Sequence, residues 1–212
     1  MPAFVRQAVN TQSAGTTVVV TITAPTAFDT LVCFTYSNAG DVSGVTGGGV
    51  TTWAKLKGPG PISSVWNNIY WGVVDTTPST SVTVTATSGF ILANVAEFSG
   101  RSIGADASTS QANGPSAAPS VGPITATRGC IYLANLTTGL SITAGPTGGF
   151  TALTNATVSG RSCQGAYLIA PAPSAATCGW TTGSSGSWDM TIGALLFPSG
   201  VDPNGVVGTP GV

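Results

Sequence analysis

The chain has 212 residues, of which only 6% are charged, against about 25% in an ordinary globular protein. Intrinsic disorder is excluded, because disordered segments are rich in charge and poor in apolar residues, whereas 42% of this chain is hydrophobic. The six basic residues are scattered and the net charge is −1, which argues against a nucleic-acid partner, since binding phosphates requires clustered lysine and arginine.

The first half of the chain is predicted to consist of strands, because runs of β-branched residues alternate with Gly, Pro, Asn and Ser clusters. Residues 81–87 alternate between polar and apolar, as in a half-buried antiparallel strand. Residues 38–49 are interpreted as a glycine-rich loop. Within it, residues 44–49 lack the Gly-Lys-Ser/Thr ending of a phosphate-binding loop and are interpreted as a mobile connection between strands. The strands expected in this half are residues 16–23, 30–36, 51–57, 64–74, 81–87 and 91–98.

Residues 100–123 are interpreted as a linker that contains a short strand near 106–111. The last twelve residues, 201–212, are too rich in proline and glycine for a regular element and are expected either to be disordered or to form an extended C-terminal arm that lies on a neighbouring chain. Between these two segments, strands are expected at residues 130–136, 150–153, 162–169, 176–181 and 188–197.

The two halves share landmarks in the same order, offset by about 97–101 residues. Asp29-Thr-Leu-Val-Cys-Phe corresponds to Arg128-Gly-Cys-Ile-Tyr-Leu, and Glu-Phe-Ser-Gly at 97–100 corresponds to Phe-Pro-Ser-Gly at 197–200. We therefore predict an antiparallel β-sandwich, jelly-roll-like or immunoglobulin-like, as a single domain over 1–200 built from two pseudo-repeated halves at about 16–100 and 121–200. Segments 30–36 and 129–136, 66–74 and 163–170, and 91–98 and 190–197 should occupy equivalent places.

The chain lacks the residues that most enzymes use. It contains no histidine, which removes the usual general base and the commonest metal ligand. Its seven acidic residues form no local pair with acid/base spacing, and Glu97, in an apolar strand beside Phe98, is interpreted as an outward strand position. No catalytic, cofactor-binding or metal-binding residue is therefore predicted, and the chain is expected not to be an enzyme.

Aromatic residues and cysteines remain as candidates for recognition or crosslinking. Trp66, Tyr70 and Trp71 fall on one strand, with Trp66 and Tyr70 on one face and Trp71 on the other. They are candidate contacts for a glycan or a partner protein, although packing in a core or between subunits is the simpler interpretation. Cys163 and Cys178 lie on neighbouring predicted strands and are a candidate disulfide, the alternative being buried free thiols.

The order of motifs resembles β-sandwich domains of tailed-bacteriophage structural proteins and of some secreted bacterial proteins. The resemblance covers most of residues 16–200. It is carried by Asp-Thr-Leu-Val-Cys-Phe (29–34), Thr-Thr-Trp-Ala-Lys-Leu (51–56), Ser-Val-Trp followed by Tyr-Trp (64–71), Ser-Val-Thr-Val-Thr (81–85) and Glu-Phe-Ser-Gly (97–100). It implies a virion role without catalysis, either a minor tail protein on the particle surface or a capsid decoration protein. A carbohydrate-binding β-sandwich module is the further alternative.

The start of the chain, Met1-Pro-Ala-Phe-Val-Arg-Gln, has no apolar signal-peptide segment. Unless such a segment has been removed, the protein is expected to be made in the host cytoplasm and to reside in the virion. The charge-poor composition favours a homo-oligomer that contacts other tail or capsid proteins. In the alternative of a carbohydrate-binding module, a host-surface glycan is a candidate partner. No membrane contact and no cofactor are expected.

Overall fold

The computed structural model describes all residues except 1, 13–14, 58–65, 172 and 199–212. Within this part the regular elements are all strands, paired antiparallel, and none is a helix, which confirms the predicted all-β class. The arm expected at 201–212 lies outside the described residues.

The first half contains strands β1–β8 in two sheets. The larger sheet has the order β1-β8-β3-β6-β5, and the smaller sheet has the order β2-β7-β4. The strands are β1 (Phe4–Gln12), β2 (Thr17–Thr21), β3 (Thr30–Ser37), β4 (Val42–Gly47), β5 (Ala54–Lys57), β6 (Trp66–Val73), β7 (Ser81–Ala86) and β8 (Ile91–Phe98).

The second half contains strands β9–β18. Its larger sheet has the order β13-β15-β11-β18-β9, with β14 also paired to β15, and its outer strands form the pairs β10-β16 and β12-β17. The strands are β9 (Gly104–Gly114), β10 (Ser120–Thr125), β11 (Cys130–Thr138), β12 (Ile142–Ala144), β13 (Thr151–Ala152), β14 (Ala156–Val158), β15 (Arg161–Ala170), β16 (Ala175–Gly179), β17 (Thr181–Thr182) and β18 (Trp188–Leu196).

The larger sheets of the two halves have the same strand order. β1, β8, β3, β6 and β5 hold the places that β9, β18, β11, β15 and β13 hold in the second half. The three predicted segment pairs therefore fall on corresponding strands, β3 with β11, β6 with β15, and β8 with β18. This agreement supports two pseudo-repeated halves, and a common origin of the halves stays a prediction.

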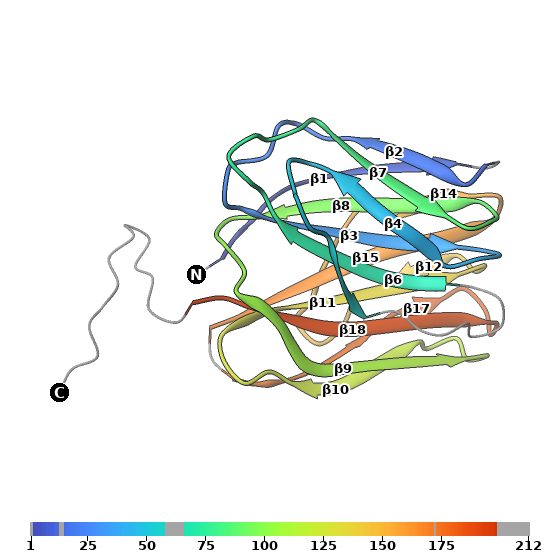
Figure 1. Cartoon of the computed structure of the whole chain (residues 1–212). Helices are drawn as coiled ribbons and strands as arrows, with labels where there is room; N and C mark the ends of the chain where they lie inside the picture. Colours follow the sequence, from blue (N-terminus) through green and yellow to red (C-terminus); the bar gives the residue numbers. More distant parts are fainter. Residues whose placement is uncertain (1, 13–14, 58–65, 172, 199–212) are drawn as a thin grey trace.

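The sheets stack in four layers, with the two larger sheets face to face in the middle (Figure 1). The outer sheet of each half packs on the opposite face of its larger sheet. β3, β8, β11 and β18 are consequently covered on both faces and buried along nearly their whole length, whereas β2 and β7 alternate with period two. Burial on both faces explains why the middle strands carry apolar residues on both faces and do not alternate with period two.

The seam between the halves is apolar at one end and polar at the other. Phe34, Ile69 and Phe98 pack against Ile131 and Leu133 from the second half. Two glycines of the second half allow close approach, because a Cβ on Gly165 would lie 2.8 Å from the ring of Phe34, and one on Gly193 would lie 3.0 Å from Leu56.

Two buried asparagines connect the halves in the polar part of the seam. The side-chain amide of Asn67 donates to the carbonyls of Asn135 and Asp189, both at 3.0 Å. Asn135 Nδ2 donates in turn to Asn67 Oδ1 (2.8 Å) and to the carbonyl of Thr35 (3.2 Å). Such pairing satisfies polar groups that burial would otherwise destabilise and fixes the register of the two sheets.

Two expectations about connections are wrong, and one strand, β1, was not expected. Residues 100–123 are not a linker, because β9 and β10 occupy most of them, with β9 extending the short strand expected at 106–111. Residues 38–49 contain β4, with short connections at 38–41 and at Gly48–Gly49, where φ is +70° and +77°. β1 precedes the first expected strand. These strands lie at the ends of their sheets, where small polar residues suffice and the apolar signal is weak.

Candidate functional site

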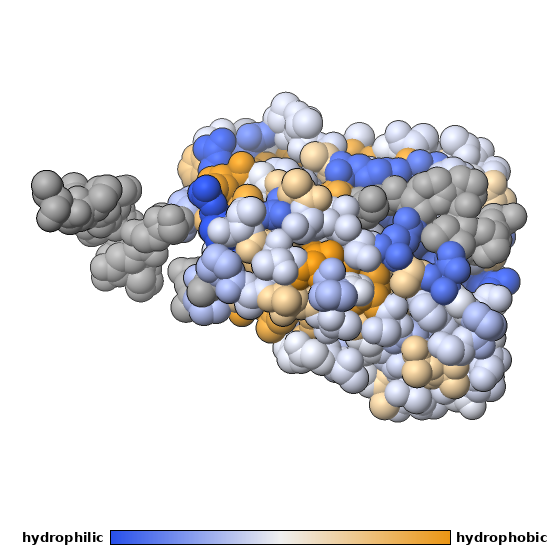
Figure 2. Space-filling view, turned by 90° about the horizontal axis from the view of Figure 1, so that it is seen from below, coloured by the Kyte–Doolittle hydropathy of each residue, from blue (hydrophilic) through white to orange (hydrophobic). Residues whose placement is uncertain are grey.

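Four of the seven acidic residues are buried, namely Asp29, Glu97, Asp106 and Asp189. Burial of this many carboxyls leaves a charge-poor exterior, and Figure 2 shows a face on which most residues have intermediate hydropathy and few are strongly hydrophilic. Each buried carboxyl lies in a different environment, and these environments decide what the residues can do.

Glu97 is not an outward position, as the sequence suggested, but is only 2% exposed and points into the first sandwich. Its carboxylate accepts hydrogen bonds from Arg6 Nε at 2.5 Å and from the Thr26 amide at 2.9 Å. Asp29 lies beside it and accepts from the Gly100 amide at 2.8 Å. Burial, and then the neighbouring Glu97, raise the pKa of Asp29 above its usual 3.8.

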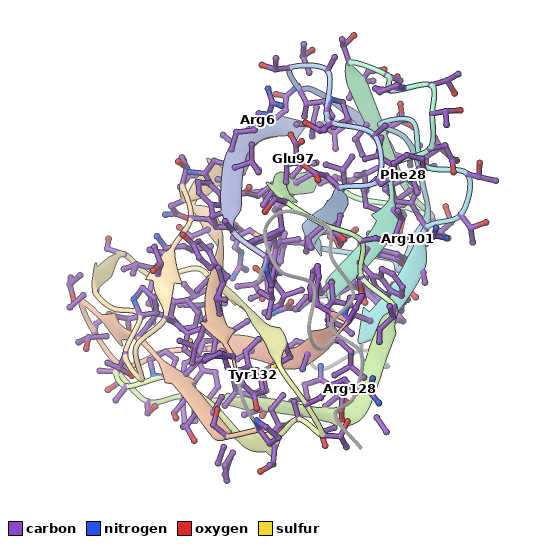
Figure 3. All side chains as sticks on the ribbon, turned by 90° about the vertical axis from the view of Figure 1, so that its left-hand side faces the viewer. Arg6, Phe28, Glu97, Arg101, Arg128 and Tyr132 are labelled. Atoms are coloured by element: carbon purple, nitrogen blue, oxygen red, sulfur yellow. The ribbon has the colours of Figure 1, made fainter. Side chains whose placement is uncertain are left out.

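A hollow of about 150 Å³ adjoins the Arg6–Glu97 pair, between β1, β8 and the segment after β2. Figure 3 shows Arg6 and Glu97 facing each other at one end of the molecule. The fold thus brings two carboxyls together that are 68 positions apart in sequence, through the pairing of β3 with β8. Because Arg6 and Thr26 already occupy the Glu97 oxygens, this cluster is suited to joining β1, β8 and the 22–29 segment rather than to proton transfer.

Asp189 lies at the polar end of the seam and is 5% exposed. Its Oδ1 accepts no hydrogen bond within the described residues, and burial raises the pKa of its carboxyl to about 6. Asp106 differs, since burial alone would raise its pKa, but hydrogen bonds from Ser108 and Thr127 outweigh burial and lower the pKa below 3.8. Of the four buried carboxyls, Asp189 is therefore the one whose ionised form is disfavoured by burial alone, without a contribution from a neighbouring carboxyl.

The candidate disulfide between Cys163 and Cys178 is not formed, and all four cysteines are buried free thiols. Cys163 faces the seam, where its Sγ donates to Asn135 Oδ1 at 3.3 Å, whereas Cys178 lies on β16 in the core of the second half. The two side chains point into different layers, which excludes a bond. Burial raises the pKa of Cys163 to about 12, so the thiol is unreactive at neutral pH.

The three aromatic candidates have different surroundings. Tyr70 is buried, with its hydroxyl donating to the Val42 carbonyl at 2.9 Å, so it cannot contact a glycan or partner and that interpretation is wrong for this residue. Trp66 is half-buried. Trp71 is also half-buried, on the opposite face from Tyr70, and it lines a surface groove.

This groove, with a volume of about 350 Å³, runs between β5, the end of β6 and the segment that joins the two halves. Asp75 Oδ2 accepts hydrogen bonds from the amide (3.0 Å) and the hydroxyl of Thr51. Arg101 is exposed and has no ion-pair partner within the described part of the chain. The groove is lined by Thr51, Thr52, Ala54, Trp71, Gly72, Val73, Asp75, Arg101, Ser102 and Ile103.

The walls of the groove are fixed by hydrogen bonds from both halves. The Ser102 amide donates to Thr30 Oγ1 at 2.9 Å, and its hydroxyl donates to the Leu196 carbonyl at 3.1 Å. The amide of Ile103 donates to the same carbonyl at 2.9 Å, and that of Asp75 donates to the Gly49 carbonyl at 2.7 Å. A groove held in this way does not need to be ordered when a ligand binds.

Two exposed apolar residues accompany the groove. Ile103, in its wall, is 51% exposed, and Phe28 is also 51% exposed with a φ of +70°. A positive φ is unfavourable for a bulky residue, and such strain gathers at functional sites. Phe28 bonds through its amide to the carbonyl of Val74, next to Asp75, and it lies on the same side as Arg101 in Figure 3. Sequence reasoning missed Phe28, Asp75 and Arg101, since no motif connects them.

No family model, curated protein or solved structure matches this chain. Among the described residues, no three His, Cys, Asp or Glu side chains lie close enough to hold a metal ion. The same part of the chain has no helix with the length and apolar character needed to span a bilayer.

Proposed function

We propose that this chain is a non-enzymatic structural subunit on the surface of a tailed-phage virion, as a minor tail protein that works as a homo-oligomer. The motif order from 51–56 to 97–100 supports this proposal through its resemblance to phage β-sandwich proteins. The alternative of a capsid decoration protein rests on the same resemblance.

The observation that carries the proposal is the scarcity of surface charge. Of thirteen charged residues, Asp29, Glu97, Asp106 and Asp189 are inside, and the Lys55–Asp41 pair neutralises two of the rest at 2.9 Å. Surfaces with few charges lack the repulsion that keeps freely dissolved proteins apart, and they are suited to contact with neighbouring subunits. The four-layer stack supplies a stiff body for such a subunit, with the small polar side chains of Ser, Thr and Asn left for its surface.

The test is to purify phage particles from lysates of cells that express the gene together with the genome it belongs to, and to analyse the proteins of these particles by mass spectrometry. The proposal expects the chain in the particles, and gold-labelled antibodies should decorate the tail. Labelling of the head would favour the decoration protein. Presence in the lysate together with absence from the particles would contradict both.

Self-association is measured separately by analytical ultracentrifugation of the full chain over a wide concentration range. An oligomer that persists on dilution supports the proposal, and a monomer at every concentration contradicts the homo-oligomer.

A further inference from the structure

The groove beside Trp71 has the composition of a sugar-binding site. A sugar ring has apolar C–H faces and a rim of hydroxyls, so it is bound by a flat apolar surface with hydrogen-bonding groups beside it. Trp71 presents part of its indole to the groove while the rest packs against the apolar part of the seam. The volume of about 350 Å³ is within the range of about 300–1,000 Å³ typical of ligand pockets.

Hydroxyl groups of a ligand would find both donors and acceptors in this groove. Asp75 Oδ2 is held by Thr51, and its Oδ1 has no partner within the described residues, so the carboxylate is oriented and can still accept. Thr52 is exposed and adds a hydroxyl that donates or accepts. These groups are suited to a polyhydroxylated ring better than to a purely apolar ligand.

The exposed guanidinium in the groove indicates the class of sugar. Arg101 has no ion-pair partner in the described residues, in contrast to Arg6 and Lys55, which pair with Glu97 and Asp41. A guanidinium presents parallel N–H donors that match a carboxylate. Arg101 therefore favours a ligand that has a carboxylate as well as apolar faces. Asp75 lines the same groove without pairing with Arg101, so such a ligand must place hydroxyls, and not carboxylates, beside Asp75.

We propose that this groove binds an acidic saccharide, a chain of sugar rings that carry carboxylates, such as uronic acids. Trp71 contacts a ring face, Asp75 accepts from ring hydroxyls, and Arg101 binds a carboxylate. This binding activity is independent of the virion role, because neither the groove nor its ligand requires a neighbouring subunit. The site differs from the aromatic strand surface suggested by the sequence, since Tyr70 takes no part.

The test compares three probes with the full chain: oligogalacturonate, a neutral maltooligosaccharide of equal length, and a polyglutamate peptide. Calorimetry and tryptophan fluorescence should show binding of oligogalacturonate and neither of the other two. R101Q should weaken this binding about tenfold, the loss of a charge-assisted hydrogen bond, without moving the melting temperature. W71F, which keeps apolar packing, should weaken binding and reduce the fluorescence change.

The matched control is R128Q, because Arg128 is also exposed, has no described ion pair and lies at the same end of the molecule, outside the groove (Figure 3). R128Q should bind oligogalacturonate like the wild type. Equal losses in R101Q and R128Q would indicate general charge attraction and overturn the site. Binding of polyglutamate would overturn the saccharide, equal binding of the neutral sugar would overturn the acidic class, and no binding of any probe would overturn the proposal.

Discussion

Replacing Asp189 by asparagine should stabilise the protein at neutral and alkaline pH. Asp189 is 5% exposed and its Oδ1 accepts no hydrogen bond within the described residues. Burial raises the pKa of the carboxyl to about 6, so the folded protein binds this proton more tightly than the unfolded chain does. Ionisation therefore destabilises the fold, and asparagine cannot ionise.

The size of the effect follows from the two pKa values. The gap between about 6 in the folded protein and 3.8 in the unfolded chain corresponds to about 3 kcal/mol, at about 1.4 kcal/mol for each tenfold change in proton affinity. This loss is complete above about pH 7, shrinks as the pH falls through 6, and is gone below about pH 4. For a chain of this length, about 3 kcal/mol changes the melting temperature by about 6–12 °C.

The assay is thermal and urea denaturation of the wild type and D189N from about pH 4 to pH 8. The advantage of D189N should be largest at pH 8 and should vanish at pH 4. D106N is the matched control, because hydrogen bonds hold the pKa of Asp106 below 3.8. D106N should be less stable than the wild type at neutral pH. This difference in stability should shrink in acid, where Asp106 of the wild type becomes protonated. A D189N variant that is less stable at pH 8, or that shows no pH dependence, would refute the reasoning.

Three further outcomes are expected. R6M should lower the free energy of unfolding by about 2 kcal/mol, which is less than the about 3–5 kcal/mol for a fully buried pair because the Arg6 side chain is 35% exposed. Adding E97Q should restore part of this loss. Urea denaturation that shows no loss for R6M would contradict the role of the pair. G165V should lower the free energy of unfolding by about 1–3 kcal/mol, because the valine side chain would clash with Phe34. Adding F34L should restore part of this stability. If the effects of the two substitutions were simply additive, the close approach of Gly165 and Phe34 would be contradicted. The four cysteines should not react with a thiol reagent until the protein unfolds, and rapid labelling of the native protein would contradict their burial.

The middle strands of the sheets were predictable because their signal is strong. β3, β8, β11 and β18 are covered on both faces, so large apolar residues are frequent on both faces of each strand, although isolated polar residues such as Asn135 and Asp189 are buried among them. The edge strand β9, Gly-Ala-Asp-Ala-Ser-Thr-Ser-Gln-Ala-Asn-Gly, pairs only with β18 within the described residues. Its small polar residues resemble those of a loop, because an edge strand is stabilised by its backbone pairing more than by burial.

The candidate site was predictable only in part, because it is made by tertiary contacts. Trp71 was noticed as an aromatic residue, and the alternation of side chains along a strand correctly placed it on the other face of β6 from Tyr70. The alternation does not show, however, which of the two faces a neighbouring sheet covers. Asp75 and Arg101 line the same groove because the segment after β8 is fixed to Thr30 and Leu196. The same holds for Glu97, whose burial depends on Arg6, 91 residues away.

The fold changes what the net charge implies about partners. The sequence has seven acidic and six basic residues, but Asp29, Glu97, Asp106 and Asp189 are buried, so the acidic side chains lose most of their share of the surface. Arg101 and Arg128 keep an exposed charge at one end of the molecule (Figure 3). Two exposed arginines are too few to bind the phosphates of a nucleic acid, which requires several neighbouring basic residues. One arginine in a groove that also contains an indole is enough to bind a single carboxylate. A slightly acidic sequence is therefore compatible with a ligand that carries carboxylates, because four of the seven acidic side chains lie inside the protein, and Asp75, which lines the groove, can accept ligand hydroxyls.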